Sequence, residues 1–415
     1  MSNEVRTEGL WRNANFVRLW GATAGANFGD GMVLAAAPLL AATLTRHPAL
    51  VAGLTVAQRL PWFLFSLPSG ALVDRWNRKK VFGFANLFRA LMLAVLTISI
   101  FLKVSTILSL YVVFFLLGMA ETLVDNSALA VLPALVPRSE LEKANGHLFA
   151  TYTAVNEFVG PPVGSSLFAG LTTLPFLVTS VSYGLAALPA FFLTGRFTPA
   201  SDSAGLTWGQ LWHDIHEGLR WFLAHRILRT LGMMAGVVNF FYAATISVFV
   251  LFAQDILGLN EVQYGLVLAT GAIGGIAGGL AAKRMVGQAG AGWTIFLTNL
   301  LPGLAYLTIA LTRNAYVVGA MFAVMSFAAM VGNVVLITLR QTIIPDGLLG
   351  RVTSAYRLLG LGALPLGAFA GGMLADRLGL VAPYLFGGGL LILMAFALLP
   401  VLNNRALATA GYSRP

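Results

Sequence analysis

The sequence contains no cysteine, which excludes disulfide bonds, thiolate zinc and iron–sulfur sites, and cysteine nucleophiles. Its five histidines are scattered and form no metal-binding pattern. It also lacks the phosphate-binding loop G-x-x-x-x-G-K-[ST], so we do not expect ATP to be its energy source. The sequence also contains no recognisable set of a nucleophile and a general base of the kind that an enzyme needs. We therefore expect neither an enzyme nor a resident cofactor or metal.

Charge is scarce as well. Only 10% of the 415 residues are charged, 58% are hydrophobic, and the mean hydropathy is +0.80. A soluble domain has roughly 25% charged residues, so this chain cannot cover a water-facing surface of its size. The net charge of +10 comes from basic residues set among apolar runs, which indicates membrane topology rather than nucleic-acid binding. The first 14 residues are polar, and we expect no cleaved signal peptide.

Apolar runs long enough to cross a membrane, about 20 residues each, divide the chain evenly. They predict an all-α membrane protein with twelve transmembrane helices, at 16–44, 49–73, 81–102, 107–125, 147–170, 175–195, 229–254, 264–282, 292–312, 315–338, 352–375 and 382–402. The longest polar interval is central. We therefore expect a six-helix half at 1–195, a linker at 196–226 and a second six-helix half at 227–415.

The linker has a pattern of its own. Apolar residues recur there at helical spacing among polar ones, at Trp208, Leu211, Trp212, Ile215, Leu219 and Phe222. The pattern predicts an amphipathic helix lying in the membrane interface. Two interpretations stay open, a tether between the halves and a lipid-responsive regulatory element.

Basic residues predict the orientation, because Lys and Arg concentrate in cytoplasmic loops. With a cytoplasmic N-terminus, 20 of the 26 Lys and Arg residues fall in cytoplasmic segments and four fall outside. We expect both termini in the cytoplasm.

The two halves repeat at a spacing of 208 residues. Gly70, Leu72 and Arg75 align with Gly278, Leu280 and Lys283, so each half has a basic turn after its second helix. Two halves in parallel arrangement are typical of a transporter whose site lies between them.

The turn after the second span carries a recognisable motif. It contains Gly70, Asp74, Arg75 and Arg78, and it resembles the major facilitator superfamily signature G-x-L-x-D-R-x-G-R-K/R. Asn77 stands where the superfamily usually has glycine, and asparagine tolerates the left-handed backbone of such a turn. The fifth span carries Gly160, Pro161, Pro162 and Gly164, similar to the antiporter motif G-P-x-x-G-G.

The opening FVRLW and the stretch PALVPRSELEKANG at 133–146 resemble the twelve-helix drug:proton antiporters of the Tap and macrolide-efflux branch. The resemblance implies the major facilitator fold and a monomeric exporter. It also implies a conformational switch in which Asp74 docks on the start of the eleventh helix and Arg78 meets Asp125. Such contacts would form in the outward-open state only. A packing role for the Gly-Pro-Pro run is equally compatible with its residues.

Ionisable groups at membrane depth are costly and usually functional. Asp30 and Arg59 have similar depths on the first two helices and could pair, as could Arg89 and Glu121 on the next two. Glu157 has no obvious cation. Desolvation favours the protonated form of such a carboxyl group, so Glu157 is our first candidate for proton coupling and Asp30 the second. A neutral, hydrogen-bonded Glu157 with a packing role is the alternative.

Apart from Arg229 at the first position of its span, the spans of the second half contain no charged residue except Arg357. We expect them to supply an adaptable apolar wall. The candidate cavity residues of the two halves are Asn27, Asn239, Phe240, Tyr242, Met325 and Asn333.

The leading hypothesis is a proton-coupled exporter of lipophilic antimicrobials in the bacterial inner membrane, working by alternating access. Its partners would be a small lipophilic substrate, protons and membrane lipids, with no nucleic acid. Export of an endogenous product such as a siderophore, and a lipid flippase on the same fold, are alternatives. A non-transporting membrane sensor is the least favoured, because nothing in the sequence supports it.

Overall fold

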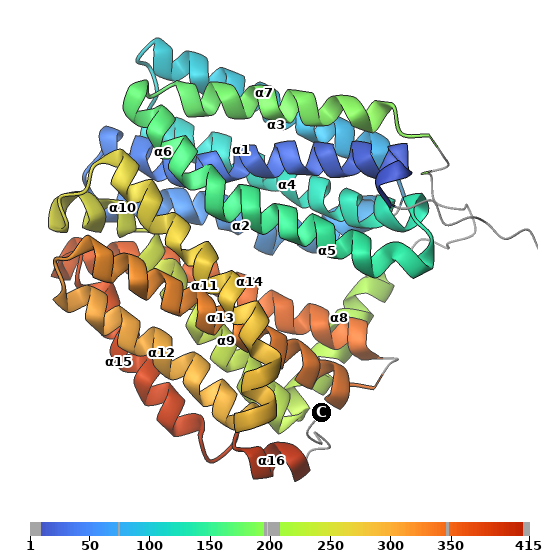
Figure 1. Cartoon of the computed structure of the whole chain (residues 1–415), viewed down its shortest axis with the longest axis vertical. Helices are drawn as coiled ribbons and strands as arrows, with labels where there is room; N and C mark the ends of the chain where they lie inside the picture. Colours follow the sequence, from blue (N-terminus) through green and yellow to red (C-terminus); the bar gives the residue numbers. More distant parts are fainter. Residues whose placement is uncertain (1–9, 74, 195–196, 198–207, 346–347, 410–415) are drawn as a thin grey trace, which may run out of the picture. The chain divides into compact units, whose positions relative to one another are not determined.

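The computed structural model describes residues 10–73, 75–194, 197, 208–345 and 348–409, and the regular elements of this part of the chain are all helical (Figure 1). The first half contains α1 (Ala14–Leu44), α2 (Pro48–Val73), α3 (Arg78–Phe101), α4 (Ile107–Leu135), α5 (Leu141–Tyr152), α6 (Gly160–Gly170) and α7 (Leu174–Phe191). The remainder contains α8 (Trp208–Ala224), α9 (Arg226–Ile246), α10 (Phe249–Leu251), α11 (Glu261–Ala289), α12 (Ala291–Leu311), α13 (Ala315–Ile343), α14 (Leu349–Leu378), α15 (Ala382–Leu398) and α16 (Asn404–Thr409).

Among the described residues, ten helices are long and apolar enough to cross a membrane. Two further crossings complete the predicted twelve. One is the 17-residue α15, and the other is a continuous helix made of α5, the π-helical segment η3 (Thr153–Val159) and α6. Several helices extend beyond their apolar runs, such as α4, which ends at Leu135 rather than 125. Polar residues propagate a helix nearly as well as apolar ones, so hydropathy marks the membrane-embedded part and not the helix end.

Polar caps determine where several spans begin. Thr106 and Asn260 form capping boxes at the starts of α4 and α11. Asn314 accepts hydrogen bonds from the first backbone N–H groups of α13. These caps satisfy donors that have no partner within the helix.

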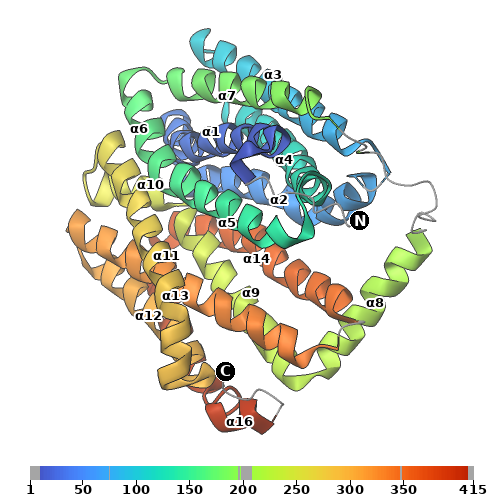
Figure 2. The same ribbon diagram turned by 45° about the vertical axis from the view of Figure 1, so that its right-hand side comes forward.

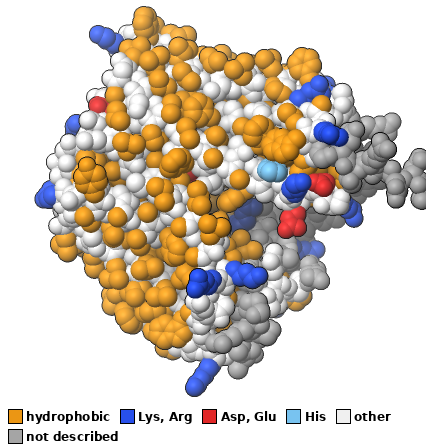
Figure 3. All heavy atoms as spheres, in the orientation of Figure 1, with side chains coloured by type: hydrophobic (Ala, Val, Ile, Leu, Met, Phe, Trp, Pro, Cys, Tyr) orange, Lys and Arg blue, Asp and Glu red, His pale blue; other side chains and the backbone are white. Residues whose placement is uncertain are grey.

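Large apolar side chains are exposed along the helices, including Leu280 at 83%, Leu311 at 81% and Tyr316 at 90%. Figure 3 shows hydrophobic side chains spread over the face that it draws, with few Lys and Arg among them. A water-soluble protein rarely exposes apolar area on this scale. The chain is a multi-pass membrane protein.

The contacts divide the chain into two compact units, and the division falls inside α1 and α2. Unit 1 comprises residues 1–36 and 64–205, and unit 2 comprises 37–63 and 206–415. In unit 1, α3 packs against α4 and α7. In unit 2, α11 packs on α13, α9 on α14, and α12 on α15 (Figures 1 and 2). The hairpin end at 37–63 thus packs with the second half of the chain.

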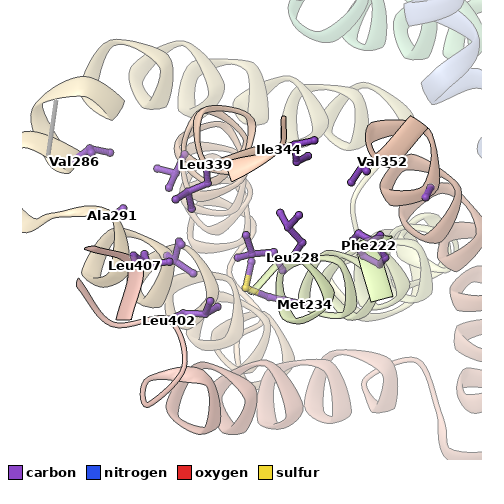
Figure 4. Packing of buried hydrophobic residues seen from close by; sticks show 14 residues of the cluster. Phe222, Leu228, Met234, Val286, Ala291, Leu339, Ile344, Val352, Leu402 and Leu407 are labelled. Atoms are coloured by element: carbon purple, nitrogen blue, oxygen red, sulfur yellow. The ribbon is translucent and has the colours of Figure 1, made fainter. Parts of the chain in front are cut away.

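A buried apolar cluster lies at one end of unit 2 (Figure 4). Its labelled members come from α8, α9, α11 to α14 and the C-terminal segment, and they are Phe222, Leu228, Met234, Val286, Ala291, Leu339, Ile344, Val352, Leu402 and Leu407. Phe222 is only 1% exposed. Burial of one phenylalanine stabilises by roughly 1.5–3 kcal/mol, so the cluster anchors α8 to this unit.

The helix predicted in the linker is therefore present as α8, and its C-terminal part docks on α14. Glu217 forms an ion pair with Arg351, and Gly218 lies against the Arg351 backbone. The side chains of 208–215, which carry most of the predicted apolar face, lie outside the described residues. The division of the chain into 1–195, 196–226 and 227–415 stays a prediction.

Glycine allows two helices of unit 1 to touch through their backbones. A Cβ atom built on Gly31 of α1 would lie 2.4 Å from the carbonyl oxygen of Asn156. One built on Gly160 would lie 2.5 Å from the Gly31 Cα, and one on Gly164 would lie 2.3 Å from the Met32 carbonyl oxygen. Small residues permit such crossings in membranes. Two residues of the predicted antiporter-like motif, Gly160 and Gly164, thus pack against α1.

The crossing predicts a specific loss of stability. Replacing Gly31→Ala should lower the stability of the folded protein by about 1–3 kcal/mol, because the added methyl group meets backbone rather than a flexible side chain. Thermal unfolding of the purified protein in detergent measures this. Gly21→Ala, on the same helix but with nothing within 4 Å of the added atom, is the matched control and should be neutral or slightly stabilising. Equal melting temperatures for the two variants would contradict the packing argument.

Candidate functional site

The described part of unit 1 contains a charged network at the middle of three transmembrane helices. Asp30 comes from α1, Arg89 from α3 and Tyr183 from α7. Arg89 is 2% exposed and Asp30 is 22% exposed. Tyr183 is also 2% exposed. This is the strongest concentration of polar groups that the structure brings together within a span.

The three side chains are joined by mutual hydrogen bonds. Arg89 Nη2 forms an ion pair with Asp30 Oδ1 and donates to Tyr183 Oη at 2.8 Å. Tyr183 Oη donates in turn to Asp30 Oδ1 at 2.5 Å. The guanidinium Cζ also lies 3.9 Å from the Tyr183 ring centroid. A buried cation therefore has both a counter-ion and a neutral partner, which offsets part of the desolvation penalty of the pair.

The residues beside Asp30 explain how its carboxylate reaches this position. Gly29 packs against Thr179 and Tyr183 of α7, and Thr179 Oγ1 donates to the Gly29 carbonyl at 3.3 Å. Gly31 packs against the fifth span on the other side. Glycine on both sides allows both neighbouring helices to approach α1 closely.

This pairing differs from the ones that depth in the sequence suggested. Depth allowed Asp30 to pair with Arg59 and Arg89 to pair with Glu121, but Asp30 pairs with Arg89. Arg59 lies on α2 in the segment assigned to unit 2. Sequence distance gives the depth of a residue in the membrane, but it does not give the direction in which its side chain points around the helix. The structure thus gives Asp30 a partner on α3 that the depth argument did not single out.

Two further carboxylates lie near the network. Glu121 and Asp125 are one turn apart on α4, and both interact electrostatically with the Arg89 guanidinium. Arg89 Nη1 also lies 3.4 Å from Asn86 Oδ1. The side chain of Arg89 is thus the common cation for acids on two helices.

Glu157 lies in the π-helical segment η3, directly before the Gly-Pro-Pro run. Pro161 and Pro162 have no N–H to donate, so carbonyl groups of the preceding turn lose their helical partners. The N–H of Gly160 bonds to Val155 in the π pattern. Glu157 is half-buried and makes no ion pair or hydrogen bond with the described residues. Single π turns within α-helices frequently mark functional sites.

The turn after α2 is described in part. Asp74 lies outside the described residues. Gly70 lies within the last turn of α2, and a Cβ atom built on it would have no atom within 4 Å. Arg75 is exposed. Arg78 Nη1 donates to the Ala130 carbonyl at 3.2 Å, on the same helix as Asp125. Lys79 Nζ donates to the Leu193 carbonyl at 2.9 Å.

Asn77, which stands where the signature has glycine, does not adopt a left-handed backbone. Its φ is −67° and its ψ is 106°, and its side chain caps α3 by accepting from the Lys80 N–H. Asparagine is among the preferred residues at this position. The departure from the signature thus has a capping role.

The proposed cavity residues are dispersed. Asn27 lies on α1 in unit 1, and the other five lie on α9 and α13 of unit 2. Asn239 Nδ2 donates to the Gly360 carbonyl at 3.2 Å. Tyr242 and Asn333 are exposed, and Asn27, Phe240 and Met325 are half-buried. In the described part of the chain, no three His, Asp or Glu residues are placed to hold a metal.

Sequence reasoning missed Tyr183. A buried tyrosine hydroxyl needs a hydrogen-bond partner, and Tyr183 is mid-helix in an apolar run at about the depth of Arg89. That signal was available, although it did not identify the partner.

The network predicts a strong coupling between its two charges. Asp30→Asn and Arg89→Gln should each lower stability by about 3 kcal/mol, because each leaves a buried partner without its counter-ion. The double variant should recover part of that loss, because neither charge remains. Thermal unfolding of the four proteins in one detergent measures the cycle. Strictly additive losses would show that the two side chains do not act as a pair.

The profile of the transmembrane secretion effector family matches residues 9–410. The multidrug efflux pump Tap of Mycolicibacterium fortuitum is 27% identical over 377 residues, which cover 88% of this chain and 89% of that protein. Macrolide efflux protein A of Streptococcus pyogenes is 24% identical over 360 residues, covering 83% and 85%.

A third relative is the enterobactin exporter EntS of Escherichia coli, 24% identical over 349 residues that cover 83% of this chain and 81% of that protein. Among solved structures, the nucleoside transporter NupG is similar in fold, with a TM-score of 0.75 at 12% identity over 94% of this chain and 99% of that one. The resemblance and the fold class predicted from sequence are confirmed. The chain belongs to the transmembrane secretion effector family, and it is a transporter of the major facilitator superfamily rather than an enzyme.

Proposed function

We propose that this transporter exports lipophilic compounds across the bacterial inner membrane in exchange for protons. The relatives named as a multidrug efflux pump and a macrolide efflux protein support export. The excess of Lys and Arg in alternate loops supports the orientation with both termini in the cytoplasm. The transporter would act as a monomer that needs no cofactor, since a proton gradient would supply the energy.

The observation that carries the proposal is the contrast between two carboxyl groups of unit 1. Asp30 has a cation, Arg89, and a hydroxyl donor, Tyr183, as direct partners. Glu157 has neither among the described residues and lies in a π-helical turn followed by two prolines that have no N–H to donate. A carboxyl group in such surroundings can take up and release a proton when water reaches it. Glu157 is therefore the proposed proton carrier, with Asp30 as the second candidate.

The proposed switch uses the turn after α2. Gly70, Asp74, Arg75 and Arg78 would hold one conformational state, and Asp125 would supply the acidic partner for Arg78. The Arg78 contact with α4 supports this role, because it brings the side chain to the helix that carries Asp125. A charge-assisted contact made in one state only would bias the cycle toward that state.

The apolar second half supports a bulky, largely hydrophobic substrate. Residues Asn239, Phe240, Tyr242, Met325 and Asn333 would contribute to its binding from unit 2, and Asn27 from unit 1. Methionine and aromatic side chains adapt to varied shapes. The enterobactin exporter among the relatives supports the second candidate, export of an endogenous siderophore.

The test separates coupling from binding. A panel of lipophilic antimicrobials in an efflux-deficient host identifies the compound against which the wild type protects most. In proteoliposomes, Glu157→Gln should abolish uptake of that compound driven by an imposed pH gradient. It should preserve binding of the same compound, because glutamine resembles the protonated acid.

Glu121→Gln is the matched control for loss of a carboxyl group within a span, and Asp30→Asn tests the second candidate. Full pH-driven transport by the Glu157→Gln variant would reject the assignment. Loss of coupling in Asp30→Asn with retention in Glu157→Gln would transfer the role to Asp30. Protection against none of the compounds, together with siderophore secretion, would favour the second candidate.

A further inference from the structure

Arg59 is a cation within a membrane span, and it is not a member of the Asp30–Arg89–Tyr183 network. It lies near the middle of α2, is half-buried, and forms no ion pair or hydrogen bond with any described residue. A charged side chain at this depth is rare unless it faces a partner or a water-filled cavity. Arg89, the comparable arginine of α3, has its carboxylate.

The packing of α2 shows which way Arg59 points. Ala52 and Phe63 both face α14, because a Cβ on Gly372 would lie 2.5 Å from the Ala52 Cβ and one on Gly362 would lie 2.8 Å from the Phe63 ring. Residues 52, 56, 59 and 63 follow one another at helical spacing on one side of a helix. Arg59 therefore lies on the side of α2 that packs with α14, between these two contacts.

A second unsatisfied donor lies beside it. Trp62 follows Arg59 by three residues, so their side chains are neighbours on the helix surface. Its indole Nε1 is buried and has no acceptor among the described residues. A buried tryptophan N–H normally has a hydrogen-bond partner. Arg59 and Trp62 together thus present a cation and a neutral donor without an acceptor.

The carboxylates that form ion pairs in the described part of unit 2 do so with residues other than Arg59. At the hairpin end, Asp255 lies 3.6 Å from Arg46 and Asp376 lies 3.5 Å from His47. His47 is twelve residues from Arg59, which corresponds to roughly 18 Å along the helix. Glu217 pairs with Arg351 of α14, eleven residues before Gly362, the nearer of the two α14 glycines that bracket Arg59. Those acids are engaged at the ends of the helices, and none of them is near the middle.

We infer that Arg59 and Trp62 bind an anionic group of the transported compound, of the carboxylate class. A guanidinium and an adjacent N–H together offer donors suited to the two oxygens of a carboxylate. The inference rests on the proposed function, in that it takes the chain to carry small molecules. It narrows the substrates to acids and zwitterions with an apolar body, and it disfavours purely cationic drugs.

A matched pair of fluorescent probes tests this. Tetramethylrhodamine carries a free carboxylate, and tetramethylrhodamine methyl ester has the same ring system without it. Fluorescence anisotropy with the purified full chain measures both affinities. The wild type should bind the acid at least tenfold more tightly than the ester.

Variants of Arg59 and Trp62 test whether these two side chains cause the preference for the acid over the ester. Arg59→Gln should weaken binding of the acid about tenfold or more and leave the ester unchanged, and Arg59→Lys should retain part of the preference. Trp62→Phe should weaken binding of the acid several-fold, since it removes one donor and keeps the aromatic ring. Arg313→Gln, at an exposed arginine outside the spans, is the control and should change neither affinity.

Equal binding of acid and ester by the wild type, or no binding of the acid, would overturn the inference. Parallel loss of both probes in Arg59→Gln, in protein with an unchanged melting temperature, would assign Arg59 a role in packing and would also overturn it. Should Arg59→Gln fail to fold, the Trp62→Phe comparison decides. Failure of pH-driven transport with the preference for the acid intact would refute the proposed coupling and leave this inference standing.

Discussion

The burial of the Arg89 guanidinium is the constraint on which unit 1 depends. A cation in the middle of a membrane span requires a counter-ion, and Asp30 supplies it only because α1 approaches both α7 and the fifth span closely. Gly29 and Gly31, on either side of the carboxylate, permit that approach. The Asp30–Arg89 ion pair therefore depends on the glycine packing of α1, and the Tyr183 hydroxyl completes its hydrogen bonds.

That arrangement gives the acids of unit 1 different surroundings. Arg89 holds Asp30 directly, and Glu121 and Asp125 share its electrostatic influence from α4. Glu157 lies apart, in the π-helical turn that the following prolines leave short of donors. The Gly31–Gly160 crossing places the helix that carries Asp30 in contact with the helix that carries Glu157. Unit 2 has a complementary character, with apolar spans and the unpartnered donors of Arg59 and Trp62.

The sequence was sufficient for the fold and for the identity of the charged residues, because apolar runs and buried charges are properties of single positions. It was insufficient for their pairing. On depth alone Asp30 could pair with Arg59, and the actual partner on α3 depends on how the helices are rotated. Tyr183 went unnoticed for the same reason. Asn77 shows a local limit, since its capping geometry depends on where α3 begins. The π-helical turn could be anticipated only as a proline break.

The central proposal is that Glu157, and not the Arg89-paired Asp30, carries the exchangeable proton. Infrared spectroscopy of the protein in lipid membranes tests it directly, because a protonated carboxyl group absorbs at a frequency distinct from that of a carboxylate. At neutral pH, the account predicts a protonated carboxyl component that shifts on hydrogen–deuterium exchange, is absent from Glu157→Gln and persists in Asp30→Asn. Loss of that component in Asp30→Asn, with its retention in Glu157→Gln, would contradict the account.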